Sequence, residues 1–212
     1  LGFDGTTSAG DTITITDTLP APTPAEFLRI TEVHYHPAAP STPAETAVSL
    51  DDDDFEFIEL MNTGTAPLDL TGVQFIEGIS YAFTPGTPLA GGARILVVKN
   101  PVAFAARYGS GFNIAGAYPQ PNLNNAGETI TLVDATGAII QSFTYDDAWA
   151  PLSDGGGRSL VARNPLAATS AWQTAAGWAL SEPNGNPGSG STALFTQFTL
   201  WQHTNFPDFL NS

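Results

Sequence analysis

TITLVDATGAIIQSFTY, residues 129–145, has the clearest hairpin pattern in this chain of 212 residues. Two segments rich in Ile, Thr and Phe, residues 129–134 and 138–145, flank the turn Asp134-Ala135-Thr136-Gly137. A glycine at the end of such a turn accepts the positive φ that a hairpin needs. The stretch therefore predicts two neighbouring antiparallel strands.

Short apolar segments between turn residues recur on both sides of this hairpin. Residues 55–62, FEFIELMN, predict a strand with Ile58 and Leu60 on one face and Phe57 and Glu59 on the other. The run RILVVK at 94–99 is typical of a central strand that is covered on both faces. Further strands are expected within residues 28–35, 73–76, 81–83 and 158–162.

About eight strands at spacings of roughly eight to twelve residues predict an all-β fold, an immunoglobulin-like antiparallel β-sandwich. One short helix is expected after the run at 94–99. Asn100 can cap it, Pro101 suits its first position and Gly109 can end it. A single helix leaves the fold class unchanged.

Composition and charge exclude several classes of partner and site. Six Lys and Arg against 21 Asp and Glu give a net charge of -15, which repels nucleic acid and anionic lipid surfaces. The chain contains no cysteine, so it forms neither disulfides nor thiolate metal sites. No apolar run is long enough to span a membrane. The acidic charge favours cations and a protein that stays soluble outside the cell.

The sequence predicts three parts. Residues 1–26 contain a strand at 11–16 and a linker at 19–26 with Pro20, Pro22 and Pro24. Residues 27–190 form the β-sandwich domain. Residues 191–212 are a linker and a short amphipathic segment, in which aromatic residues recur at helical spacing from Phe195 to Phe206. Because the chain starts at Leu1, we expect it to be a fragment of a longer precursor.

Eight segments in order resemble those of bacterial lamin tail domains: ITEVHYHP, DFEFIELMN, APLDLTGV, FTPGTPLAGGARILVV, FAARYG, NLNNAGETITLVDATG, FTYDDAWAP and SDGGGRSLVARNP. The resemblance covers about residues 27–190. It implies an immunoglobulin-like sandwich that serves as a binding or spacer module without chemistry, often among other domains of large secreted or surface proteins. Many members have tryptophan after DLTG, where this chain has Val73, so Phe75 and Phe83 are expected to fill that volume.

Glu32, His34 and His36 alternate along one predicted strand and therefore share a face. Such a set is able to hold zinc or copper. The alternative interpretation, which we favour, is that these side chains are solvated or packed at the sheet edge, because a zinc site needs further ligands.

The run Asp51 to Asp54, followed by Glu56, is the best candidate for a cation site. Clustered carboxylates repel one another, and a calcium ion would relieve that repulsion. Asp52, Asp54 and Glu56 are the predicted ligands. The alternative is a solvated acidic loop, since the run lacks the spacing of an EF-hand.

Tyr145 and Trp149, in a second loop region that is acidic and aromatic, are the candidate residues for contact with a ligand. Trp149 is able to stack on a sugar ring, but a tryptophan here more often closes one end of a sandwich. No catalytic motif with a nucleophilic serine, a zinc-binding HExxH or a phosphate-binding loop is present.

These observations predict a non-catalytic binding or structural module of an extracellular or cell-surface bacterial protein. Its expected partners are proteins or glycans at the cell surface and neighbouring domains of the same polypeptide. The alternative function is a calcium-assisted carbohydrate-binding module or a carbohydrate hydrolase that uses the acidic and aromatic loops. No cofactor other than calcium is expected.

Overall fold

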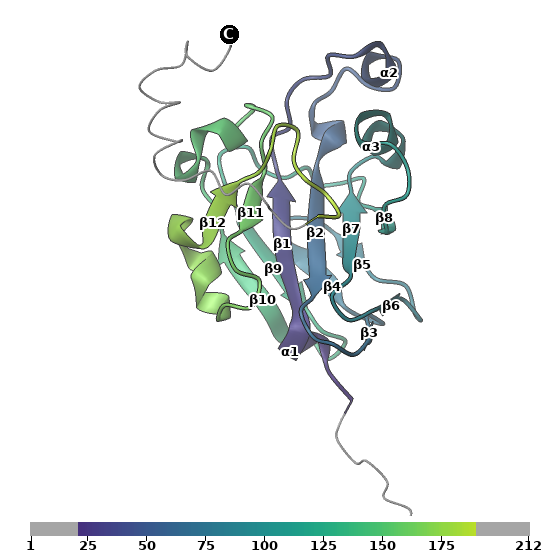
Figure 1. The fold of residues 1–212 in the computed structure, drawn as a ribbon, viewed down its shortest axis with the longest axis vertical. Coiled ribbons are helices and arrows are strands. Elements are labelled where there is room, and N and C mark those ends of the chain that lie inside the picture. Colours follow the sequence, from purple (N-terminus) through teal and green to yellow (C-terminus); the bar gives the residue numbers. More distant parts are fainter. Residues whose placement is uncertain (1–20, 190–212) are drawn as a thin grey trace, which may run out of the picture.

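The computed structural model describes residues 21–189 as two β-sheets that face each other, with short helices around their ends (Figure 1). The strand predicted at residues 11–16 and the amphipathic segment predicted near the C-terminus lie outside the described residues. The two facing sheets confirm the predicted all-β, immunoglobulin-like sandwich.

The larger sheet holds six strands in the order β12-β11-β1-β2-β7-β8. Their bounds are Trp178–Leu180 (β12), Leu160–Ala162 (β11), Leu28–His34 (β1), Phe57–Asn62 (β2), Arg94–Val98 (β7) and Ile114–Ala117 (β8).

The facing sheet holds four strands in the order β10-β9-β4-β5, and a small ribbon pairs β3 with β6. Their bounds are Ile139–Thr144 (β10), Thr129–Val133 (β9), Gln74–Glu77 (β4), Tyr81–Ala82 (β5), Leu68–Asp69 (β3) and Pro88–Leu89 (β6). The pairing of β9 with β10 confirms the predicted hairpin.

One pair departs from the predicted antiparallel arrangement, because β7 and β8 run parallel. A parallel neighbour requires a crossover, and α3 (Pro101–Tyr108) supplies it. This helix is the predicted one. The Asn100 side chain accepts hydrogen bonds from the N–H groups of Val102 and Ala103 at 3.0 and 3.3 Å. The strand β8 itself was not predicted.

The remaining helical elements are single turns that the sequence analysis did not predict. They are α1 (Pro24–Phe27), α2 (Pro43–Thr46), η1 (Asp53–Phe55), η2 (Asp147–Trp149), η3 (Pro151–Ser153), η4 (Thr169–Gln173) and η5 (Ala175–Gly177). Within residues 21–189, no helix has the length and apolar character needed to cross a membrane.

The main core lies between the two large sheets and is built from alternating strand residues. Ile58 and Leu60 of β2 face it, as predicted, and so do Leu28, Ile30 and Val33 of β1. Val73 joins the core together with Phe75 and Phe83.

A bulge in β1 lies between Ile30 and Glu32 and interrupts its regular ladder. Two side chains from outside the sheet satisfy the backbone of Ile30. Its N–H donates to Oε1 of Gln141 on β10 at 2.9 Å, and its carbonyl accepts from the indole N–H of Trp172 at 2.9 Å. The bulge thus ties the two sheets together through buried hydrogen bonds.

The outer face of the six-stranded sheet is also buried. Phe57, Leu96 and Val98 form a second apolar cluster there with Phe104 of α3. In Figure 1 the yellow-green segment that follows β12 crosses in front of β1 and β2. The expectation that Glu32 and His34 are solvated or packed at the sheet edge is therefore wrong, since both side chains are fully buried and β1 is an inner strand of the sheet.

Matched isoleucines on the core and the surface test this layering. Ile58 is completely buried in β2, whereas Ile139 on β10 is 65% exposed. We expect Ile58→Ala to lower the free energy of unfolding by about 2–5 kcal/mol, because it leaves a cavity. Ile139→Ala should change it by about 0.5 kcal/mol or less. Urea denaturation followed by tryptophan fluorescence measures both, and equal losses would contradict the assignment of faces.

Candidate functional site

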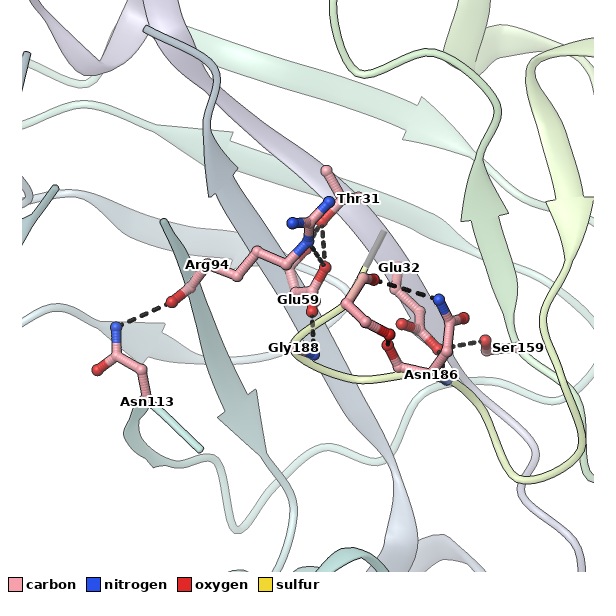
Figure 2. A network of polar contacts seen from close by, with 9 residues as sticks. Thr31, Glu32, Glu59, Arg94, Asn113, Ser159, Asn186 and Gly188 are labelled. Carbon is pink, nitrogen blue, oxygen red and sulfur yellow. Dashed lines mark hydrogen bonds and ion pairs between the residues drawn. The ribbon is translucent and has the colours of Figure 1, made fainter. Parts of the chain in front are cut away.

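A buried polar network lies on the outer face of the six-stranded sheet, at the centre of Figure 2. Glu32 of β1 and Glu59 of β2 are directly paired in the strand register. Because of the bulge, Thr31 and Glu32 both contact groups on this outer face. The covering segment, residues 181–189, follows β12 and supplies two backbone N–H donors to the network.

Glu59 is held by three donors. Its Oε1 accepts from the hydroxyl of Thr31 at 2.7 Å and from Nε of Arg94 at 2.9 Å. Its Oε2 accepts from the backbone N–H of Gly188 at 2.6 Å. Burial raises the pKa of Glu59, and these hydrogen bonds together with the Arg94 charge oppose that rise.

Glu32, on the neighbouring strand β1, binds the same segment. Its Oε1 accepts from the Ser159 hydroxyl and from the backbone N–H of Asn186 at 2.9 Å, as Figure 2 shows. Burial, with the Glu59 charge as the second cause, raises the pKa of Glu32 to about 8. Gly185 permits the close approach, because a Cβ there would lie 3.0 Å from Glu32 Oε1 and 3.2 Å from the Phe57 ring.

The two carboxyl groups therefore act as acceptors that hold the covering segment on the sheet. A carboxyl group with a pKa near 8 is able to exchange a proton close to neutral pH. Both Glu32 and Glu59 are at most 1% exposed, however, so a substrate has no access to them in this conformation. The arrangement supports a structural role for this pair.

The predicted zinc or copper set does not converge. His34 is buried with its ring edge-on to Phe57 at 5.3 Å, and its Nδ1 lies 3.2 Å from the Tyr108 hydroxyl. Burial lowers the pKa of His34 to about 3, so the ring is neutral. His36 lies beyond the strand, with Nδ1 2.5 Å from Asp154 and Nε2 3.7 Å from Asp52.

The acidic loop brings together a different trio from the predicted one. Asp51, Asp52 and Asp53 each place a carboxylate oxygen within 4.8 Å of the other two, and this is the only such group of possible metal ligands among residues 21–189. Of the predicted calcium ligands, Asp52 belongs to the trio, whereas Asp54 and Glu56 lie outside it. Burial raises the pKa of Asp53.

Glu56 turns away from the loop into the interior. Its Oε2 accepts from the Tyr118 hydroxyl at 3.0 Å and from the backbone N–H of Leu123 at 3.1 Å. Burial raises the pKa of Glu56 to about 9. Glu56 is thus a buried acceptor that holds the 118–123 segment in place. The pattern of acidic residues in the sequence did not reveal this role.

The predicted aromatic ligand pair is divided between core and surface. Tyr145 is 1% exposed, packs on Tyr35 with ring centroids 4.7 Å apart, and donates its hydroxyl hydrogen to the Asn124 carbonyl at 2.8 Å. In this position Tyr145 is inaccessible to a ligand. Trp149 is partly buried and packs against the main core, in line with the interpretation that it closes one end of the sandwich.

The family model of the lamin tail domain matches residues 21–147, which is more than half of the chain. The chain belongs to the lamin tail domain family. The match runs from α1 through β10, so the lamin tail domain contains the bulge, the acidic loop and the hairpin. A search of curated proteins returned no match. The lamin tail domain is an immunoglobulin-like, non-enzymatic family, in agreement with the fold.

Substitution of Glu32 tests the buried network through its pH dependence. The pKa of Glu32 rises from an ordinary value of 4.5 to about 8 on folding, so the native state binds this proton more tightly than the unfolded state. Stability contributed by the protonated group is therefore lost as pH rises through this window. The amide introduced by Glu32→Gln retains an acceptor oxygen and cannot ionise.

We expect Glu32→Gln to be more stable than the parent chain at pH 8 by about 2–4 kcal/mol, and to show little advantage at pH 5. Urea denaturation at the two pH values measures this difference. Glu182→Gln, at an exposed position within the same segment, is the matched control and should follow the parent chain. An equal effect of both substitutions at pH 8 would refute the role of Glu32.

Proposed function

We propose that this lamin tail domain is a non-catalytic binding and structural module of a larger secreted or cell-surface bacterial protein. The observation that carries the proposal is that three glutamate side chains bind other parts of the domain in its interior. Glu32, Glu56 and Glu59 are each buried and hydrogen-bonded to segments distant in sequence. Catalytic carboxylates need contact with a substrate, which these groups lack.

Surface hollows give no support to the alternative of a carbohydrate hydrolase. In three surface hollows on residues 21–189, Glu26 is the sole carboxylate residue of the lining. Glycoside hydrolysis uses two carboxyl groups on either side of the scissile bond. The net charge of -15 further favours protein or neutral glycan partners, and neighbouring domains, over nucleic acid and anionic membranes.

Glycan and protein arrays test this function when the array fluid is also analysed for reaction products. We expect saturable binding to a surface protein or glycan with no product formed, and labelling of intact source cells by an antibody to the domain. Asp52→Asn and Asp154→Asn variants serve as controls. Turnover of any arrayed substrate that these substitutions abolish would overturn the proposal, and binding to no partner would reduce the module to a spacer.

A second proposal concerns calcium at the acidic loop. The convergence of oxygens from Asp51, Asp52 and Asp53 within 4.8 Å favours it, because a divalent cation would offset their mutual repulsion. His36 and Asp154 lie beside Asp52 and link the acidic loop to the glycine-rich loop at 155–157. A bound cation would therefore stabilise the contact between two loops at the same end of the sandwich.

Thermal unfolding with calcium and with a chelator tests this second proposal. A cation that binds only the folded state raises stability by about 2.7 kcal/mol at one hundred times its dissociation constant. We expect calcium to raise the melting temperature of the parent chain and of Asp54→Asn, which changes the same run outside the trio. Asp52→Asn should lose the response. An unchanged midpoint, or equal responses of the two variants, would remove calcium from the function.

A further inference from the structure

A pocket of about 290 Å³ opens at the side of the sandwich where the six-stranded sheet ends in β12. Its lining includes Leu160 of β11 and both Trp178 and Leu180 of β12. Trp149 at the end of η2, Arg163 and four alanines complete the lining. The site is distinct from the acidic loop and from the buried carboxylate network.

The lining is apolar except for one side chain. No Asp, Glu, Asn, Gln, Ser or Thr lines the pocket, and Arg163 is its only charged residue. The indole N–H of Trp178 is already used, since it donates to the Trp172 carbonyl at 3.1 Å. Among the lining side chains, a ligand therefore meets aromatic and aliphatic surface, the Trp149 indole N–H and one guanidinium group.

Arg163 differs from the other cations of the chain. Among residues 21–189, which include all six Lys and Arg, Arg163 alone has no side-chain hydrogen bond or ion pair with another described residue. The other five side chains bind carbonyl, amide or carboxylate oxygens: Arg29, Arg94, Lys99, Arg107 and Arg158.

The backbone of Arg163 is nevertheless held in place. Its backbone N–H donates to the Gly177 carbonyl at 2.9 Å, directly beyond the pairing of β11 with β12. The chain has 21 acidic residues, yet the half-buried guanidinium of Arg163 has no carboxylate partner among residues 21–189. Its N–H donors are therefore available to an external anion.

We propose that this pocket binds a small organic anion with an apolar body, an aromatic or branched aliphatic carboxylate. The apolar body occupies the space between Trp149, Leu160 and Trp178, and the carboxylate pairs with Arg163. A sugar is a poorer fit, because among the lining side chains only the Arg163 guanidinium and the Trp149 indole N–H are able to hydrogen-bond with its hydroxyl groups. The inference holds for a spacer as well as for a binding module, so it stands independently of the proposed function.

Titration with 3-phenylpropionate tests the assignment, and its neutral amide is the matched probe. We expect saturable binding of the acid with a dissociation constant on the order of 1 mM, as suits a ligand of this size. Indole signals in ¹H–¹⁵N spectra, assigned with Trp149→Phe, should shift for Trp149 and Trp178. The amide should bind about tenfold more weakly or worse, because it loses the charge-assisted pair.

Arg163→Gln should weaken binding of the acid by about tenfold or more and leave the melting temperature unchanged, since the side chain has no partner among residues 21–189. Arg29→Gln removes the same charge elsewhere and should bind like the parent chain. Binding confined to N-acetyl-glycyl-phenylalanine would overturn the small-anion assignment in favour of a peptide C-terminus. Equal binding of acid and amide, or no saturable shift with the acid, would refute the site.

Discussion

The structure depends on burial of both faces of the six-stranded sheet. Its inner face packs against the four-stranded sheet, and its outer face is covered by α3 and by residues 181–189. The covering segment has little apolar surface of its own, so backbone N–H groups of Asn186 and Gly188 bind the carboxyl groups of Glu32 and Glu59. Buried carboxyl groups that accept several hydrogen bonds thus hold the covering segment on the sheet of this lamin tail domain.

Much of the fold could be predicted from local patterns. The hairpin of β9 and β10, the alternation in β2 and the cap of α3 each rest on residues close in sequence. The parallel strand β8 was missed because IAGA lacks the alternation that marks a strand and has a single β-branched residue, Ile114. Burial of Glu32 could not be predicted, since its cover lies more than 150 residues away in the chain.

The candidate sites show the same limit. An acidic run is visible in the sequence, and Asp52 does lie in a cluster of carboxylates. The inward turn of Glu56 depends on Tyr118 and Leu123, which no local pattern connects to it. The pocket at Arg163 is likewise assembled from Trp149, β11 and β12. Local sequence reveals which groups are chemically able to act, whereas long-range contacts determine which of them remain accessible.

The central position of β1 has a mechanical consequence. β1 is the first strand of the described chain and lies between β2 and β11, antiparallel to both. Ladder hydrogen bonds lie across the strand direction. A pull applied along β1 therefore loads both ladders in shear, together with the Gln141 and Trp172 bonds at its bulge. Any force that reaches the lamin tail domain through this strand is resisted by many hydrogen bonds at once.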